Sequence, residues 1–156
     1  MSKKTESVQN YWDARSELFG GYYKAPSLFD RTFRKGVYER QAVAIQACSA
    51  IPGARVLDVG SGPGINSVSL LKNARASHVT GIDFAQQMVD YASRTAVAEG
   101  VADKCTFILG DALNYDFGQE KFDYACALGV FDYIEDAGAL LSRMSALTTH
   151  SFMASW

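Results

Sequence analysis

The sequence predicts an α/β fold: a Rossmann-like parallel sheet with helices on both faces, preceded by an N-terminal helical segment. From Ala54 onward, short runs rich in β-branched and aromatic residues alternate with helical runs of about 10–15 residues. This alternation indicates parallel strands, because consecutive parallel strands need a long crossover connection. The chain has 156 residues, 48% of them hydrophobic, which suits one domain with a substantial core.

Residues 1–50 are predicted to be helical. Apolar residues recur there at intervals of three and four, in two runs separated by Gly20-Gly21. The second run is expected to begin at Ser27, which is a typical N-cap residue, and to end near Ser49.

Residues 51–156 are predicted to form the sheet domain. Strands are expected at residues 55–59, 78–82, 105–109, 122–128 and 151–156, with helices at 65–73, 85–99 and 135–147. In an open α/β sheet, a ligand binds beyond the carboxyl ends of the strands, near the point where the strand order reverses. The residues that follow the first strands are therefore the candidates for a binding site.

An acidic residue and alternate glycines mark the end of the first predicted strand, where residues 56–64 read VLDVGSGPG. Glycines at positions 60, 62 and 64 allow a ligand to approach the main chain, and the next helix begins there with unpaired N–H groups. The third glycine comes one residue too early for a dinucleotide fingerprint. The carboxylate of Asp58 favours a cationic ligand over one with two phosphates. The loop therefore predicts a site for a cationic ligand that carries a nucleoside.

Two more acidic residues end the next two predicted strands. Asp83 lies about 20 residues past the glycine loop, where an acid commonly accepts both ribose hydroxyls. Asp111 follows Gly110 at the end of the third strand. We expect Asp58, Asp83 and Asp111 to converge on one crevice. Taken singly, Asp83 and Asp111 are equally well explained as helix caps or turn formers.

These motifs resemble those of the class I S-adenosylmethionine-dependent methyltransferases. The resemblance covers about residues 54–156 and depends on VLDVGSGPG, GIDFAQQM and GDA in that order and spacing. It implies an S-adenosylmethionine-binding domain over residues 51–156, with the methionine part of the cofactor against residues 60–64. It also implies that Asp83 holds the ribose hydroxyls, with Phe84 and Met88 near the adenine, although both could simply be core residues. Asp111 would accept a hydrogen bond from the adenine exocyclic amine, and the N–H of Ala112 would face a ring nitrogen.

The strand at 122–128 resembles the fourth motif of this family, whose end flanks the reacting methyl group at Leu128, Gly129 and Val130. Taken together, the cofactor-binding residues predicted from the sequence are Asp58, Gly60, Ser61, Gly62, Gly64, Asp83, Phe84, Met88, Gly110, Asp111, Ala112 and Leu128.

The resemblance implies methyl transfer to a small, partly apolar or planar molecule by in-line displacement. Residues 1–50 would then form a lid over the site with Gly20-Gly21 as its hinge, unless their aromatic rings only pack on the sheet. No motif identifies a catalytic base, and the candidates are Tyr11, Tyr22, Tyr23, Asp132 and Tyr133. Two alternatives remain open at this point: an NAD-dependent oxidoreductase, and a non-catalytic cofactor-binding protein or fragment.

Composition argues against several partners. The formal net charge is −2 and the basic residues are scattered, which gives no case for nucleic acid. No apolar stretch approaches the roughly 20 residues that span a bilayer. Three separated cysteines, expected to be buried thiols, favour an unexported, cytoplasmic protein. No His, Asp or Glu cluster has the spacing of metal ligands.

The predicted strands also differ from the family's pattern. Sheets of this class usually have seven strands, whereas the last two are missing from this sequence. The fifth strand is therefore expected to be an exposed, apolar edge. We expect this edge to be covered by a partner chain, as in a homo-oligomer, or by the N-terminal segment.

Overall fold

The computed structural model describes Tyr11 and residues 35–156. The predicted Ser27 cap, the Gly20-Gly21 hinge and the two tyrosines at 22 and 23 lie outside the described residues. In chain order the elements are α4 (Lys35–Ser49), β1 (Arg55–Val59), α5 (Ile65–Asn73), β2 (His78–Asp83), α6 (Gln86–Ala98), η1 (Ala102–Lys104), β3 (Cys105–Leu109), β4 (Phe122–Leu128), η2 (Phe131–Tyr133), α7 (Ala137–Leu147) and β5 (Thr148–Ser155).

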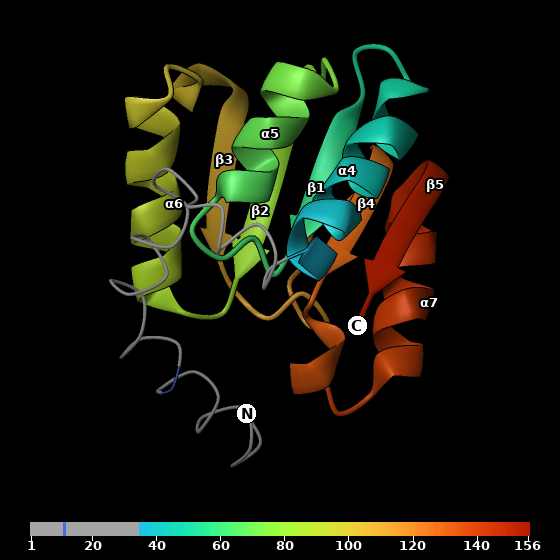
Figure 1. Ribbon diagram of the computed structural model, residues 1–156. Coiled ribbons are helices and arrows are strands. Elements are labelled where there is room, and N and C mark those ends of the chain that lie inside the picture. The colour runs from blue at the N-terminus through green and yellow to red at the C-terminus, as the bar shows by residue number, and fades with distance from the viewer. Residues whose placement is uncertain (1–10, 12–34) are drawn as a thin grey trace.

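The strands form one five-stranded sheet in the order β3-β2-β1-β4-β5, and every neighbouring pair is parallel (Figure 1). The chain builds outward from β1 in one direction through β2 and β3, and in the other through β4 and β5. The strand order therefore reverses between β1 and β4, and a ligand is expected beyond the carboxyl ends of these strands. The predicted Rossmann-like fold is confirmed.

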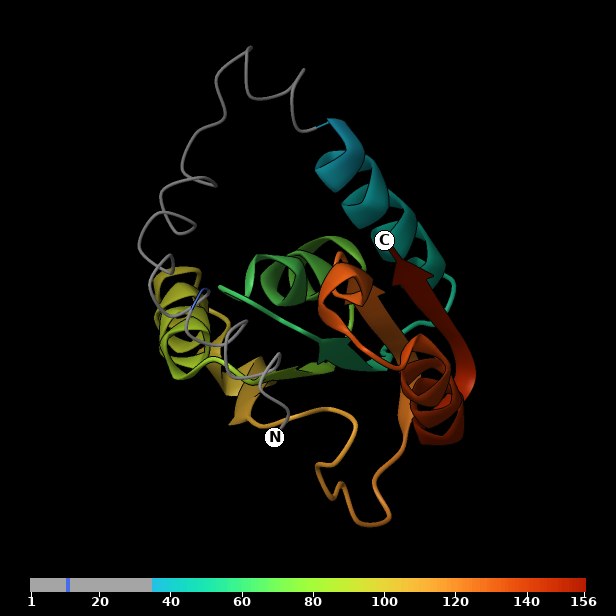
Figure 2. The ribbon, with the colours of Figure 1, turned by 90° about the horizontal axis from the view of Figure 1, so that it is seen from below.

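Helices cover both faces of the sheet. The helices α4, α5 and α6 lie on one face and α7 lies on the other (Figures 1 and 2). Residues alternate between the two faces along β1, as the period of a strand requires. Val56 packs with Cys48 of α4 and Leu70 of α5, whereas Leu57 belongs to the core that includes Leu140 of α7.

Most predicted boundaries lie within two residues of the observed ones. The largest difference is at β5, which begins at Thr148, directly after α7, and not at residue 151. Thr148 pairs with Phe122, and its hydroxyl donates to the carbonyl of Met144 at 2.6 Å. This hydrogen bond closes the last turn of the helix, so the strand begins without a connecting loop.

The outer strands β3 and β5 are more exposed than the central ones. Cys105 in β3 is only half-buried, so the prediction that all three thiols are buried is wrong at this position, because β3 is an edge strand. Among the described residues, β5 pairs only with β4, and Phe152 is 38% exposed. Within the described part of the chain, no helix is long and apolar enough to cross a membrane.

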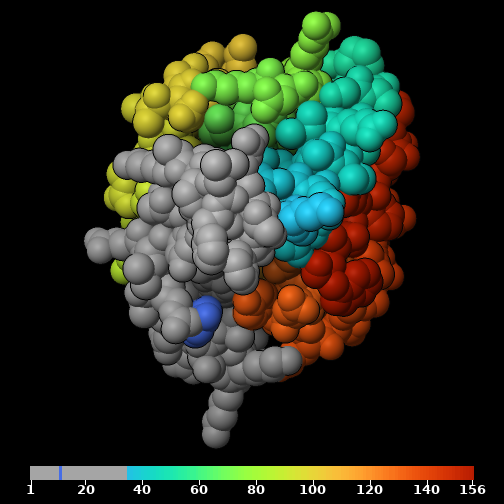
Figure 3. Space-filling model, in the orientation of Figure 1, coloured from blue at the N-terminus to red at the C-terminus, as the bar shows by residue number. Residues whose placement is uncertain are grey.

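The end of β5 is attached to two other parts of the fold. The guanidinium of Arg40 in α4 donates from Nη1 to the carbonyl of Trp156 at 2.6 Å. The rings of Trp156 and Phe131 lie 4.8 Å apart between centroids. Figure 3 shows α4 and β5 side by side at the surface. These contacts bring α4 to the carboxyl ends of β4 and β5.

Candidate ligand-binding site

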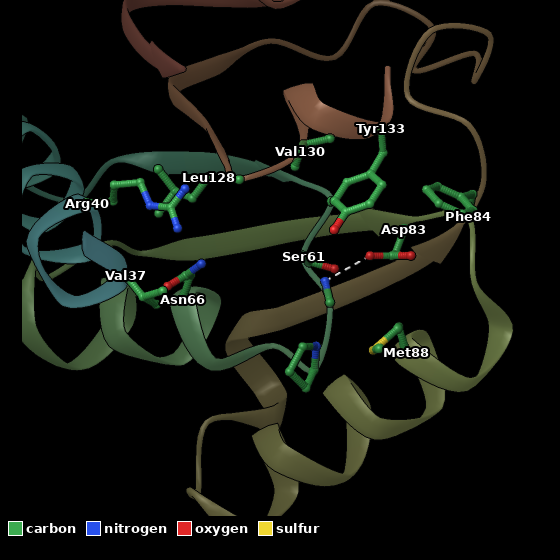
Figure 4. A pocket seen from close by; sticks show the side chains of 14 residues that line it. Val37, Arg40, Ser61, Asn66, Asp83, Phe84, Met88, Leu128, Val130 and Tyr133 are labelled. Carbon is green, nitrogen blue, oxygen red and sulfur yellow. Dashed lines mark hydrogen bonds between the residues drawn. The ribbon is translucent and has the colours of Figure 1, made fainter. Parts of the chain in front are cut away.

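A cavity of about 200 Å³ lies at the carboxyl ends of β1, β2 and β4, where the strand order reverses (Figure 4). Its walls come from α4, from the loop after β1, from the residues after β2, and from the segment after β4. The lining residues are Val37, Arg40, Gly60, Ser61, Gly62, Pro63, Asn66, Asp83, Phe84, Met88, Leu128, Gly129, Val130 and Tyr133. Seven of the predicted site residues are among them: Gly60, Ser61, Gly62, Asp83, Phe84, Met88 and Leu128.

A second, smaller cavity of about 30 Å³ shares walls with the first, at Gly60, Asp83, Phe84 and Val130. Its remaining walls include three more of the predicted residues, which follow β3, and two apolar side chains from the α7 side of the sheet. These are Gly110, Asp111 and Ala112, with Ile134 and Leu140. The predicted residues after β1, β2 and β3 therefore border one continuous region.

The glycine loop brings bare main chain to this region. Gly62 has a φ of +51°, and no atom lies within 4 Å of the place where a Cβ would be. At Gly60, with a φ of +66°, a Cβ would lie 2.5 Å from Cγ2 of Val130. A side chain at position 60 would thus collide with the opposite wall. A Cβ at Gly64 would lie 2.9 Å from Cβ of Ala92 in α6, so this glycine serves helix packing, and it lines neither cavity.

The carboxylate of Asp83 is fixed by the main chain on both sides. Its Oδ2 accepts from the N–H of Gly62, and its Oδ1 accepts from the N–H of Ala85, both at 2.9 Å. The residue is 8% exposed and lines both cavities. A carboxylate has about four lone-pair sites, so holding two backbone donors is compatible with accepting hydroxyl groups of a ligand as well. Asp83 therefore presents an oriented acceptor at the wall.

Asp111 forms a turn and borders the smaller cavity at the same time. Its Oδ1 accepts from the N–H of Leu113 at 3.0 Å, and its Oδ2 accepts from the side-chain amide of Asn114 at 2.6 Å. This is the turn-forming role that the sequence left open. Asp111 also lines the smaller cavity, so this turn lies at the cavity wall.

Asp58 lies away from both cavities, so the expected convergence of three carboxylates is wrong for this residue. It is 1% exposed, and its side chain accepts from Oγ of Ser67 at 2.6 Å and from Sγ of Cys126 at 3.5 Å. Like Val56, it points under α5, because alternate residues of a strand share a face. Burial raises the pKa of Asp58 to about 6, although the hydrogen bonds from Ser67 and Cys126 act in the opposite direction.

Arg40 is a lining residue that the sequence analysis missed. In Figure 4 it lies at the end of the larger cavity opposite Asp83. Its Nε donates to the carbonyl of Gly36 at 3.2 Å and its Nη1 to that of Trp156. A Cβ at Gly129 would lie 3.2 Å from Nη1, so this glycine makes room for the guanidinium. The cavity thus has a cation at one end and a carboxylate at the other.

The candidate catalytic bases that the structure describes differ in whether they line the cavity. Tyr133 lines the larger cavity, whereas Asp132 is exposed and lines neither, and Tyr11 is 45% exposed. Burial raises the pKa of Tyr133, and the neighbouring Tyr11 and Asp132 act in the same direction. The phenol is therefore neutral at neutral pH, and it is better suited to donate a hydrogen bond than to act as a base.

Two further observations concern the polar groups near the cavity. The hydroxyl of Ser61 is buried and has no hydrogen-bond partner among the described residues. In Tyr11 and residues 35–156, no group of three or more His, Cys, Asp or Glu side chains could hold a metal ion.

Comparisons with known proteins agree with this geometry. A family profile described as "Methyltransferase domain" matches residues 56–150. A demethylmenaquinone methyltransferase from Deinococcus radiodurans is 31% identical over 143 residues, which are 90% of this chain and 58% of that protein. The chain spans just over half the length of the first two curated relatives it matches.

Two solved structures show the same arrangement of elements. A methyltransferase from Thiobacillus denitrificans in complex with S-adenosyl-L-homocysteine has a TM-score of 0.60 and 32% identity, over 71% of this chain and 44% of that one. A magnesium protoporphyrin IX methyltransferase from Synechocystis PCC 6803 with bound S-adenosylmethionine has a TM-score of 0.78, over 95% of this chain and 73% of that one. Its identity is 21%, so this second likeness concerns the fold alone.

Proposed function

The chain belongs to the methyltransferase domain family, and from this premise we propose that it is an S-adenosylmethionine-dependent enzyme that methylates a small, partly apolar or planar molecule by in-line displacement. The observation that carries the proposal is the cavity itself. Oriented Asp83, open main chain at Gly62 and the cation Arg40 meet there at the carboxyl ends of β1, β2 and β4.

The polar groups of the cavity match those of S-adenosylmethionine. The cofactor has a ribose diol, an adenine, and an amino acid end with a carboxylate. We propose that Asp83 accepts from the diol and that Arg40, at the opposite end, binds the carboxylate by a charge-assisted hydrogen bond. The hydroxyl of Ser61, which has no hydrogen-bond partner among the described residues, lies between Arg40 and Asp83 in Figure 4. A polar ligand atom there would give it a partner.

The adenine is assigned to the smaller cavity and the walls next to it. Phe84 and Met88 supply apolar surface for the ring. We assign to Asp111 a hydrogen bond from the exocyclic amine and to the N–H of Ala112 a contact with a ring nitrogen, since both residues line this cavity. The contacts predicted for Gly60 and Leu128 remain part of the proposal. Asp58 and Gly64 line neither cavity, and the proposal gives them no contact with the cofactor.

When bound, the cofactor supplies a methyl group activated by its sulfonium. The protein then has to align the acceptor with this group and exclude water. Leu128 and Val130 form an apolar wall at the end of β4, beside the glycine loop. A wall of this kind lowers the local dielectric, which favours a reaction in which the positive charge is dispersed. Tyr133 is assigned the role of a neutral hydrogen-bond donor at this wall.

The class of acceptor is supported by the cavity and by one relative. Among the described residues, Leu128 and Val130 make the wall around the proposed methyl position apolar, and the phenol of Tyr133 lies next to them as a polar contact. The 31% identical relative acts, according to its name, on demethylmenaquinone. A quinone has a planar ring, which fits the proposal of a planar or partly apolar acceptor.

The proposal is tested by calorimetric titration with S-adenosylmethionine, S-adenosylhomocysteine and NAD⁺. We expect both sulfur compounds to bind and NAD⁺ not to bind. Asp83→Asn should weaken binding by about 1–3 kcal/mol, because it replaces a charged acceptor by an amide. Arg40→Met should weaken binding by a similar amount, and should do so for both sulfur compounds, since both carry the carboxylate.

A matched control is Asp90→Asn, on the exposed side of α6, where the carboxylate accepts from Gln86. This variant should bind like the wild type. Binding of NAD⁺ in preference to the sulfur compounds would support the oxidoreductase alternative and refute the proposal. Binding without methyl transfer to any planar acceptor would leave a non-catalytic cofactor-binding protein.

A further inference from the structure

The segment between β3 and β4, residues 110–121, carries two of the residues assigned to the adenine but contains no helix. Asp111 and Ala112 stand at its start. A connection without regular structure has few backbone hydrogen bonds of its own to hold it in place. The position of Asp111 therefore depends on contacts from elsewhere in the fold.

Aromatic side chains anchor the middle of this segment to the sheet. The ring of Tyr115 packs on Gly110, where a Cβ would lie 3.0 Å from its Cδ2. Phe117 is buried and meets Tyr115 edge to face, at 4.8 Å between centroids, and Phe122 of β4 at 5.7 Å. These edge-to-face contacts hold the side chains of the segment against the sheet. They do not bind its backbone carbonyl groups.

Arg143 of α7 holds the main chain of the segment directly. Its Nη2 donates to the carbonyl of Tyr115 at 2.5 Å, and its Cζ lies 5.9 Å from the centroid of the Phe117 ring. Its Nε is buried and has no hydrogen-bond partner among the described residues. A buried, unpaired donor is unfavourable. Among the described residues, the contacts with the Tyr115 carbonyl and the Phe117 ring are the ones that hold the guanidinium in this position.

The contact continues from Arg143 to Asp111 through the main chain of one residue, Tyr115. The N–H of Tyr115 donates to the carbonyl of Asp111 at 2.8 Å, while the carbonyl of Tyr115 accepts from Arg143. The side chain of Asp111 is fixed in turn by Leu113 and Asn114 within the same turn. One helical turn before Arg143, Leu140 lines the smaller cavity. Thus α7 contributes Leu140 to the wall of this cavity, and its Arg143 binds the main chain next to the turn of Asp111.

We propose that Arg143 is a positioning residue: through the carbonyl of Tyr115 it holds the turn that aims the carboxylate of Asp111 at an exocyclic amine of the bound purine. This inference rests on the proposed function, and it adds that selectivity for an amino-purine over an oxo-purine depends on a side chain that touches no ligand. The Arg143 guanidinium lines neither cavity.

The test compares S-adenosylhomocysteine with S-inosylhomocysteine, in which a carbonyl replaces the exocyclic amine. For the wild type we expect the adenosyl compound to bind about tenfold or more tightly, since the inosyl compound places a carbonyl oxygen opposite Asp111 where the adenosyl compound has an N–H donor. Arg143→Met should reduce this ratio to about twofold. Arg143→Lys, which keeps one donor for the carbonyl of Tyr115, should give an intermediate ratio.

The matched control is Arg94→Met. Arg94 lies on α6 with its Cζ 5.3 Å from the centroid of the Tyr91 ring, so the same substitution removes a similar cation–π contact away from the cavities. Its selectivity ratio should equal that of the wild type. Circular dichroism and a thermal melt identify a variant that does not fold, and if Arg143→Met does not, Arg143→Lys carries the comparison.

The outcomes separate the two proposals. A wild type that binds neither compound overturns the proposed function and this inference with it. A wild type that prefers the adenosyl compound, together with an unchanged ratio in the folded Arg143 variants, overturns the inference alone. An equal loss of affinity for both compounds would mean that Arg143 has a general structural role, and it would also overturn the inference.

Discussion

At the scale of single residues, Asp58 and Asp83 show how two similar acids acquire different environments. Each stands in a parallel strand next to the glycine loop. Asp83 ends β2 and reaches the cavity, whereas Asp58 lies one residue before the end of β1 and points under α5. In the register of the two strands Asp58 lies opposite Gly81, two residues before Asp83, so the acids share a face of the sheet and differ in depth. Asp83 stands at the strand end beside the cavity, whereas Asp58 lies deeper, beneath α5.

The burial of Asp58 predicts a pH dependence of stability. Its pKa rises from the ordinary 3.8 to about 6 in the folded chain. Between these values the folded state binds more protons than the unfolded state, so the free energy of unfolding falls as pH rises through this window. The variant Asp58→Asn does not titrate at this position. Its free energy of unfolding, relative to the wild type, should rise by about 2 kcal/mol between pH 4 and pH 7.

Urea denaturation at four pH values over this range measures the difference. The control is Asp90→Asn, which makes the same change from carboxylate to amide at an exposed position of α6. A difference for Asp58→Asn that stays constant, or falls with pH, would show that the buried carboxyl is not responsible.

Sequence motifs were informative for residues whose role depends on the main chain. Gly60, Gly62 and Asp83 follow strands in a fixed spacing, and the cavity contains all three. Arg40 has no such signal. It reaches the cavity only because α4 packs against α5, where Gln41 donates to the side chain of Asn66 at 3.0 Å. Tertiary packing of this kind cannot be deduced from local spacing.

At the scale of elements, the alternation of strands and helices was sufficient to predict the sequence of elements along the sheet domain. The strands β1, β3 and β4 have the predicted bounds, because each is a short apolar run flanked by turn residues. The short helix η2 was not predicted. It follows β4 closely and ends at Tyr133. With only three residues it is too short for hydrophobic periodicity to reveal it.

The N-terminus of α7 offers an element-scale prediction. Asp136 is its N-cap, and its Oδ1 accepts from the N–H of Ala139 at 2.8 Å. Asp136→Ala should lower the free energy of unfolding by about 1 kcal/mol, the usual contribution of such a cap. Chemical denaturation measures this change. The exposed Asp132, four residues earlier, supplies the comparison: Asp132→Ala should change stability by less than about 0.5 kcal/mol. Equal effects of the two variants would contradict the capping role.

At the scale of the whole molecule, the outer strand β5 bears on whether the protein associates with itself. The sequence TTHSFMAS of β5 contains no lysine, proline or acidic residue, which are the features that commonly prevent edge strands from pairing. An edge of this composition favours association with another strand. The self-association expected from the sequence remains a prediction, and β5 is the element at which it should be tested.

We expect the chain to self-associate through β5 at micromolar concentrations, and Phe152→Lys to weaken this association by about tenfold. Sedimentation velocity over a concentration series measures the dissociation constant. Val97, on α6, is also exposed, at 68%, and Val97→Lys controls for the general effect of replacing a surface apolar residue by a charge. A wild type that remains monomeric throughout the series would contradict the prediction.

The hydrogen bond from Arg40 to the carbonyl of Trp156 has a thermodynamic consequence. The same guanidinium faces the cavity, so the order at the end of β5 and the occupancy of the cavity share a common term in free energy. Linkage makes such a relation reciprocal. Under the proposed function, binding of the cofactor carboxylate at Arg40 and the order of the terminal residues of β5 therefore affect each other by the same amount of free energy.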